Sequence, residues 1–269
     1  MSGVAGMVDL HHHILPEVDD GARNLDEAVQ LARRAVEQGI STVVATPHVF
    51  DGVHDVERGV ALAAADRLRD ALALARVPLE IRVAAELRVD ERLEQRLREE
   101  PGLSLDGHGR YALIELPHES VPPFLTPLLF RMRAHGTVPV IAHPERNLGV
   151  RGNPEITQQW VEFGAMLQIT AAALDGALGP VIGRTARHLL AHGRVHLVAT
   201  DAHRIDRRPP HVAAAFEIAE RVVGRDGAHA LFMGNPAIVA RSGSPDAVVA
   251  PVRVRRGGLV GWFDRVRST

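Results

Sequence analysis

Short apolar runs alternate along the chain with longer segments in which apolar residues recur every three or four positions. The short runs are rich in β-branched residues and predict buried strands; they are MVDLHHHI, STVVATPH, LEIRVAAEL, YALIEL, TVPVIAHPER, AMLQIT and VHLVATDAH. The longer segments predict helices after Asn24 and near residues 55–76, 90–99, 124–135, 154–163, 178–192 and 211–223. Seven strands, each followed by a helix, favour a parallel α/β fold, either closed as a barrel or open.

The segment after Asn24 carries the clearest helix signals. Asn24 can cap the helix, Glu27 can complete a capping box, and Gly39 stands where the helix would stop. We therefore interpret Asp26 and Glu27 as capping acids. The predicted apolar face consists of Leu25, Ala28, Leu31, Ala32, Ala35 and Val36.

Composition restricts the chemistry available to the chain. Its 269 residues, 46% of them hydrophobic, suffice for a sizeable core in one or two domains, and no linker is visible before about Ser242. The absence of cysteine excludes disulfides, thiolate metal sites and a thiol nucleophile. All 31 basic residues are arginine, which excludes Schiff-base chemistry and the lysine of a Walker loop. With 15 histidines present, we expect chemistry based on histidine, carboxylate and arginine.

Charge and hydropathy limit the partners and the location. The formal net charge of -2 and the pI near 6.7 argue against strong nucleic-acid binding. No apolar run is long enough to span a bilayer, and no secretory signal is visible at the N-terminus, so we expect a cytoplasmic protein. The segment from Ala250 holds five arginines and one aspartate and forms a basic tail.

Residues of metal-binding types stand at the predicted carboxyl ends of six of the seven strands. They are His11 and His13, His48, Glu86, Glu115, His143, and Asp201 with His203; Arg146 follows His143 closely. The carboxyl ends of parallel strands share one face, where active sites assemble. Side chains alternate along a strand, so His11 and His13 point the same way and His12 points away. Mixed imidazole and carboxylate ligands suit manganese, iron or zinc, and a carboxylate can bridge two ions.

Each of these residue types also has an ordinary structural interpretation. The pair Asp19 and Asp20 before Gly21 is typical of a simple turn, and Arg207 is interpreted as a solvated neighbour. The remaining histidines are interpreted as structural or exposed; they are His12, His54, His108, His118, His135, His188, His192, His196, His211 and His229. The shared placement of the strand-end residues is what favours a metal site.

Six motifs together resemble the PHP (polymerase and histidinol phosphatase) superfamily, and more closely its bacterial CpsB/CapC/YwqE branch of metal-dependent protein-tyrosine phosphatases. They are DLHHHILPEVDDGARNLDEA, VVATPH, AAEL, YALIEL, VIAHPERN and ATDAHRIDRRPP. The resemblance implies a single α/β domain over residues 7–240, folded as a distorted, TIM-like (β/α)7 barrel. Residues 241–269 would then be a C-terminal extension ending in the basic tail.

The resemblance also implies three divalent ions, usually manganese, with iron or zinc as alternatives. The first ion would be held by His11, His13, Glu86 and Asp201. The second would be held by Glu86, Glu115 and His143, and the third by Asp20, His48 and His203. Arg146 and Arg208 match the arginines that contact the phosphate. The chain departs from the family at His12, where a small polar residue is usual, and at Val49, where a second histidine is frequent.

The implied reaction is hydrolysis of a phosphomonoester by a metal-activated hydroxide that attacks phosphorus in line. The implied substrate is phosphotyrosine on a protein, namely a bacterial tyrosine kinase of capsule or exopolysaccharide synthesis. Two alternatives stay open: a small-molecule phosphatase, such as one for histidinol phosphate, or another PHP phosphoesterase, and a metal-stabilised scaffold without turnover. The chain could also form a homo-oligomer. Trp262 and Phe263 in the tail could touch an anionic membrane, although a solvated or oligomer-packed extension is the simpler interpretation.

Overall fold

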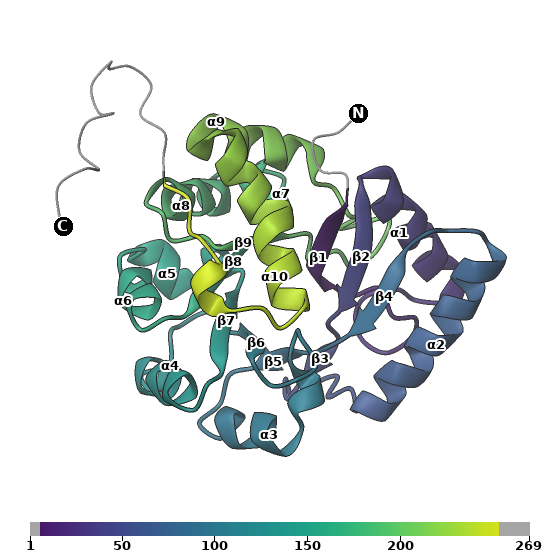
Figure 1. Cartoon of the computed structure of the whole chain (residues 1–269), viewed down its shortest axis with the longest axis horizontal. Helices are drawn as coiled ribbons and strands as arrows, with labels where there is room; N and C mark the ends of the chain where they lie inside the picture. Colours follow the sequence, from purple (N-terminus) through teal and green to yellow (C-terminus); the bar gives the residue numbers. More distant parts are fainter. Residues whose placement is uncertain (1–5, 253–269) are drawn as a thin grey trace, which may run out of the picture.

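The structure is a computed structural model, and it describes residues 6–252 (Figure 1). The strands lie at the centre and helices surround them. In chain order the strands are β1 (Met7–His12), β2 (Ile40–Ala45), β3 (His48–Val49), β4 (Glu80–Val83), β5 (Glu86–Arg88), β6 (Tyr111–Glu115), β7 (Val138–Ala142), β8 (Met166–Thr170) and β9 (Leu197–Ala199). Each strand lies within a segment that the sequence pattern predicts as a strand, or directly continues one.

Every predicted helix overlaps an observed one. The α-helices are α1 (Leu25–Glu37), α2 (Arg58–Leu74), α3 (Leu93–Glu99), α4 (Leu125–Ala134), α5 (Leu148–Gly152), α6 (Ile156–Glu162), α7 (Ala171–Leu174), α8 (Pro180–Ala191), α9 (Ala213–His229) and α10 (Asn235–Ala240). Short turns of other helix types are η1 (Pro101–Leu103), η2 (Pro144–Arg146), η3 (Ala230–Gly234) and η4 (Pro245–Ala247). The sequence pattern does not predict α5, α7 or α10, which are too short to show a helical period.

The cap of α1 is confirmed, but the capping box is not formed as predicted. The side chain of Asn24 accepts a hydrogen bond from the backbone N–H of Glu27 at 2.9 Å. The carboxylate of Glu27 accepts instead from the backbone N–H of Arg23, one residue earlier, at 2.9 Å. The same carboxylate also accepts hydrogen bonds from the guanidinium of Arg23 and from the backbone N–H of Ile205. Glu27 therefore joins the start of α1 to the segment after β9.

The strands form two parallel sheets that are connected at both edges. One sheet has the order β1-β2-β4 and the other β3-β5-β6-β7-β8-β9. The chain passes directly from β2 to β3 and from β4 to β5. At each of these two points it leaves the first sheet and enters the second. At the opposite edge, an isolated parallel bridge pairs His12 with Ala202. The N–H of His13 donates to the carbonyl of Ala202 at 2.8 Å, and the N–H of Asp201 donates to the carbonyl of His11 at 2.9 Å.

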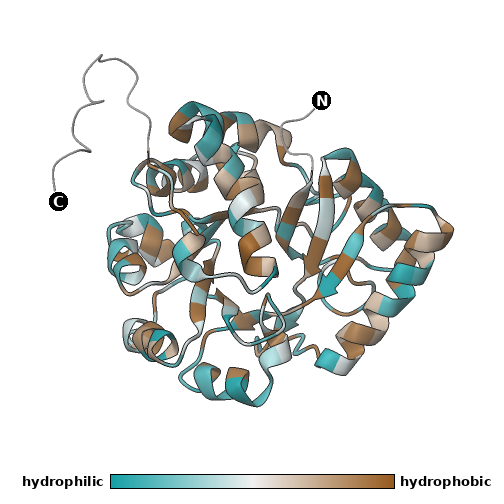
Figure 2. Ribbon diagram, in the orientation of Figure 1, coloured by the Kyte–Doolittle hydropathy of each residue, from teal (hydrophilic) through white to brown (hydrophobic). Residues whose placement is uncertain are grey.

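The core lies on both sides of the strands. One buried cluster is formed by side chains that several strands direct toward one another, including Leu10, Val44, Leu113, Val140 and Leu197. Two further clusters pack the other strand faces against the surrounding helices. In Figure 2, hydrophobic residues are frequent on the strands, whereas the outer turns of the helices carry many hydrophilic residues. Because the strands are parallel and held by this packing, their carboxyl ends lie together on one side of the sheets and form a rim there.

Within residues 6–252, no helix has the length and apolarity that crossing a bilayer requires. The predictions for Trp262 and Phe263 lie outside the described residues, as does most of the basic tail.

Candidate metal centre and phosphate site

Eight of the nine predicted metal ligands converge at the carboxyl ends of the strands. They form three overlapping groups, in each of which one ligand atom per residue lies within 4.8 Å of the others. The groups are His11 with His13 and Asp201; His11 with Glu86 and His143; and His13 with Asp20, His48 and His203. The ninth residue, Glu115, lies outside these groups and pairs with Arg88 at 2.9 Å.

The hydrogen-bond network fixes the orientation of His11. The amide nitrogen of Gln168 donates to the carbonyl of Ile169 at 2.8 Å, so its oxygen faces His11. This oxygen lies 2.9 Å from His11 Nδ1 and can only accept a hydrogen bond. His11 Nδ1 therefore carries a proton, and Nε2 is the ring nitrogen that faces the cluster.

His13 is oriented in the same way by a carboxylate. Its Nδ1 lies 2.8 Å from Asp19 Oδ2, and this carboxylate also accepts from the N–H of Gly21 at 3.0 Å. Because a carboxylate only accepts, His13 Nδ1 donates, and its Nε2 faces His11 Nε2 at 3.3 Å. Carboxylates and amides that orient the far nitrogen of a histidine are typical of metal sites.

Imidazole nitrogens and carboxylate oxygens meet at the buried centre of the cluster. Glu86 Oε2 lies 3.2 Å from His11 Nε2 and 3.3 Å from His13 Nε2, and Asp201 Oδ1 lies 3.3 Å from His11 Nε2. Among the described residues, neither carboxylate oxygen has a hydrogen-bond partner, although both are buried. Two ligands bound about 2.1 Å from one ion lie about 3.0–3.4 Å apart. The residues present therefore fit a divalent metal centre.

Glu86 lies between four of the clustered histidines. Its Oε1 lies 2.9 Å from His143 Nε2, and its Oε2 lies 3.3 Å from His48 Nδ1 as well as near His11 and His13. Burial opposes its ionisation, but the surrounding histidines, His11 first, hold the pKa of Glu86 well below its ordinary value. The carboxylate is therefore charged and presents both oxygens to separate ligand groups.

The third group is more open to solvent. Asp20 Oδ1 lies 3.3 Å from His203 Nε2 and 3.4 Å from His48 Nε2. Partial burial opposes ionisation, yet the hydrogen bonds of these two histidines hold the pKa of Asp20 far below its usual range. Burial lowers the pKa of His203 to about 4, which keeps its imidazole neutral and able to bind a metal. A cavity of about 290 Å³ opens here, beside Asp20, His203 and Arg208.

Both predicted phosphate-contacting arginines point into the centre. Arg146 Nη1 and Arg208 Nη1 each lie 2.7 Å from the same oxygen of Asp201, Oδ2. Burial opposes the charge of Asp201, but His11, then Arg208, hold its pKa well below the usual range. Arg207, interpreted from sequence as a solvated neighbour, is exposed. Asp201 therefore presents one oxygen to the histidines and the other to both guanidinium groups.

Two site residues have backbone conformations that L residues rarely adopt. His143 has a φ of 30° and Asp201 a φ of 51°, both in the left-handed region. Such strain costs about 1–3 kcal/mol per residue and gathers at functional sites. At the strand ends, it turns these side chains into the cluster.

Sequence reasoning misses three residues that support the predicted ligands: Asp9, Asp19 and Gln168. The sequence pattern indicates only a turn at Asp19 and only a buried strand at Gln168. Burial raises the pKa of Asp9 to about 6, although hydrogen bonds from Thr200 favour its ionised form. A charged residue inside the apolar run MVDL is a signal that could have identified Asp9. His12, interpreted from sequence as structural or exposed, is fully buried, and burial holds its pKa well below the ordinary value.

A family model described as capsular polysaccharide synthesis, CpsB/CapC, matches residues 7–241. This chain belongs to the CpsB/CapC family. The tyrosine-protein phosphatase YwqE of Bacillus subtilis is 38% identical over 220 residues, which are 82% of this chain and 86% of that protein. The tyrosine-protein phosphatase CpsB of Streptococcus pneumoniae is 29% identical over 239 residues, 86% of this chain and 96% of that protein. The resemblance inferred from the motifs is thereby confirmed.

A solved structure extends the likeness to three dimensions. It comes from crystal structures of YwqE from Bacillus subtilis and CpsB from Streptococcus pneumoniae, described as unique metal-dependent tyrosine phosphatases. The match has a TM-score of 0.85 at 35% identity, and it covers 93% of this chain and 100% of that chain. The CpsB/CapC fold is therefore present over nearly the whole chain.

Proposed function

We propose that this protein is a metal-dependent phosphatase that removes the phosphoryl group from phosphotyrosine on a protein. The observation that carries the proposal is the buried cluster of potential ligand atoms of His11, His13 and Glu86, with two arginines directed at its edge. The membership of the chain in the CpsB/CapC family and its likeness to YwqE and CpsB support the same activity.

Different side chains would bind the metal ions, bind the phosphate and position the arginines. Divalent ions held by the nine predicted ligands would supply Lewis-acid charge and a nucleophile derived from water at neutral pH. Arg146 and Arg208 bind the phosphate oxygens in fork geometry and stabilise the charge that spreads over them. Asp201 holds both guanidinium groups in position before the substrate arrives. A tyrosyl leaving group, with a pKa near 10, needs less protonation than an alkoxide.

Several finer points belong to the same proposal. We propose three ions, with manganese as the metal, and Glu115 as a ligand that exchanges its partner Arg88 for an ion. We propose that a tyrosine kinase of capsule or exopolysaccharide synthesis is the substrate and that the protein acts in the cytoplasm, where ATP-dependent kinases work. Residues 7–240 would form the phosphatase domain and 241–269 an extension.

The fold is part of the proposal as well. When β2 with β3 and β4 with β5 are each counted as one broken strand, the hydrogen bonds pass through seven strands and return to β1 at Ala202. We propose that this arrangement is a distorted (β/α)7 barrel.

The test compares phosphate release from an aryl phosphate, a phosphotyrosine peptide and histidinol phosphate with added manganese. We expect turnover of the first two, loss with chelator, and loss in His11→Ala but not in His108→Ala, which alters an exposed histidine outside the site. Preference for histidinol phosphate would favour the small-molecule alternative. Metal-loaded wild-type protein that hydrolyses none of the three substrates would refute the proposal. Turnover that His11→Ala leaves unchanged would refute it as well.

A further inference from the structure

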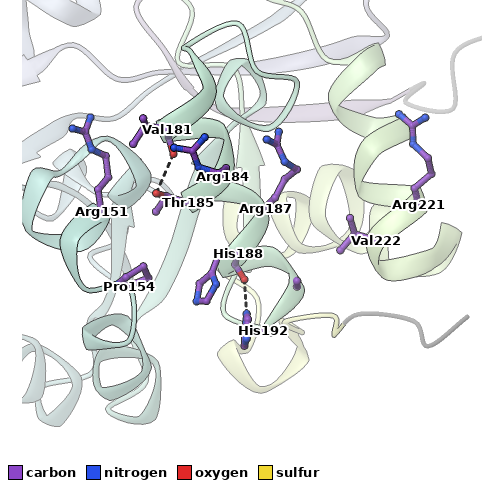
Figure 3. A pocket seen from close by; sticks show the side chains of 11 residues that line it. Arg151, Pro154, Val181, Arg184, Thr185, Arg187, His188, His192, Arg221 and Val222 are labelled. Atoms are coloured by element: carbon purple, nitrogen blue, oxygen red, sulfur yellow. Dashed lines mark hydrogen bonds between the residues drawn. The ribbon is translucent and has the colours of Figure 1, made fainter.

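A groove rich in arginine lies between α5, α8 and α9, and its lining includes none of the predicted metal ligands. Four arginines line it, namely Arg151 of α5, Arg184 and Arg187 of α8, and Arg221 of α9, together with His188 and His192. Its volume is about 740 Å³. Figure 3 shows the four guanidinium groups in a row that runs from α5 across α8 to α9.

The positive charge of this row is not neutralised locally. Within residues 6–252, none of the four guanidinium groups lies within ion-pair distance of a carboxylate. Arg187 donates to the backbone carbonyl of Leu174 at 3.1 Å. Because a carbonyl is neutral, this hydrogen bond leaves the positive charge of Arg187 uncompensated. The nearby carboxylate of Glu155 is already engaged by Arg194 and by His188. Like charges placed in one groove repel one another, so an anionic occupant would relieve that repulsion.

The groove adjoins the turn that carries a phosphate-contacting arginine. The turn η2, which ends at Arg146, packs against both α5 and α8. Arg151 follows Arg146 by only five positions. A polypeptide held at the metal centre could therefore continue into the groove, because an extended chain spans about 3.3–3.6 Å per residue.

We propose that this groove binds an acidic segment of the protein substrate whose phosphotyrosine occupies the metal centre; the proposal rests on the proposed function. A second contact on the same polypeptide raises the effective concentration of the phosphotyrosine at the site. The volume of 740 Å³ exceeds what a single phosphate needs and suits several side chains.

The lining favours a peptide over other polyanions. It offers no Trp, Tyr or Phe on which bases could stack, and the net charge of the whole chain is -2, which disfavours nucleic acid. A membrane surface would be expected to meet a convex face with aromatic or large apolar side chains, not a concave row of arginines.

The first experiment measures binding without catalysis. A fluorescent peptide of glutamate and serine, free of phosphotyrosine, is titrated with the metal-loaded full chain, and a matched glutamine peptide serves as the reference. We expect the acidic peptide alone to bind, with an affinity that falls at high salt. The variant Arg184→Glu/Arg221→Glu should weaken binding about ten-fold. The control Arg33→Glu/Arg225→Glu, which makes the same charge change at exposed positions outside the groove, should bind like the wild type.

The second experiment separates this proposal from the proposed function. With a phosphotyrosine peptide flanked by acidic residues, the groove variant should raise KM about ten-fold at unchanged kcat, while kcat/KM for a small aryl phosphate stays constant. Equal losses in the groove and control variants would overturn the groove proposal, as would groove-dependent binding of an oligonucleotide or anionic vesicle in place of the peptide. A wild type that hydrolyses aryl phosphate but shows no groove effect in either experiment refutes only the groove. A wild type without phosphatase activity refutes the proposed function, and the binding experiment still decides the groove.

Discussion

The imidazole of His13 is held by the carboxylate of Asp19, with Nδ1 and Oδ2 only 2.8 Å apart. The side chain of Asp19 is almost inaccessible, and its other oxygen accepts from the backbone of Gly21. Burial opposes its ionisation, but the nearby His13 lowers the pKa of Asp19 below its ordinary value. A turn that looks merely structural in the sequence thus orients the imidazole of a predicted metal ligand.

We expect Asp19→Asn to weaken divalent-metal affinity about 10–100-fold, the usual effect of losing such a partner. The amide retains the shape but loses the charge that makes His13 a stronger ligand. Calorimetric titration with manganese measures the change. Asp26→Asn, the same substitution at an exposed site on α1, should leave affinity unaltered. Equal affinity in both variants would show that Asp19 serves only the turn.

Arg146 and Arg208 should be intolerant of lysine. Their guanidinium groups meet at one oxygen of Asp201, and a lysine retains the charge but lacks the planar fork. We expect either Arg→Lys change to lower kcat/KM for an aryl phosphate about 100-fold, in line with loss of one preorganised donor. Arg207→Lys is the control and should be neutral. If Arg146→Lys and Arg208→Lys remain as active as Arg207→Lys, the phosphate is bound elsewhere.

The order of strands and helices was predictable because it rests on local periodicity. The convergence of His11, His48 and Glu86 was predictable as well, since the carboxyl ends of parallel strands share one rim. Neither inference requires knowledge of side-chain packing.

The partners of the ligands could not be predicted in the same way. Gln168 reaches His11 across 157 residues of sequence, and Asp9 reaches Thr200 across 191. Both sit inside strands, where the sequence pattern shows burial but not which neighbour the register supplies. The pairing of Glu115 with Arg88 likewise depends on the alignment of β5 with β6. The arginine groove is assembled from three helices and leaves no local signature.

Gly21 should tolerate no side chain. A Cβ at this position would lie 2.0 Å from the carbonyl oxygen of His13 and 2.7 Å from its Cβ. We expect Gly21→Ala to displace His13, to lower the free energy of unfolding by about 3 kcal/mol and to weaken metal binding. Denaturant unfolding of the metal-free protein isolates the first effect.

Gly59 provides the matched control for this substitution. It lies in the first turn of α2, and a Cβ added there would have no neighbouring atom within 4 Å. Gly59→Ala should therefore stabilise the protein, by about 0.5 kcal/mol, through helix propensity. A Gly21→Ala protein as stable as Gly59→Ala would mean that the backbone of His13 moves at no cost.

The stability of the fold should fall as the pH is lowered, partly through His196, which lies away from the metal centre. Its Nδ1 accepts a hydrogen bond from the backbone N–H of Leu167 at 3.2 Å, and only 8% of the residue is exposed. Burial lowers the pKa of His196 from 6.5 to about 4. The unfolded chain therefore binds a proton in a pH range where the folded chain does not.

The sign of the effect follows from this difference in pKa. The contribution of His196 to stability is complete above pH 6.5 and is lost progressively as the pH falls toward about 4. One proton over this interval corresponds to a loss of about 3 kcal/mol. Urea unfolding across the interval measures it, with His196→Gln for comparison, because glutamine can still accept from Leu167 but does not titrate. We expect a shallower pH dependence in His196→Gln and an unchanged one in His108→Gln, whose imidazole is exposed. Identical slopes in all three proteins would mean that His196 takes up its proton equally readily in the folded state, so that its burial does not exclude the charge.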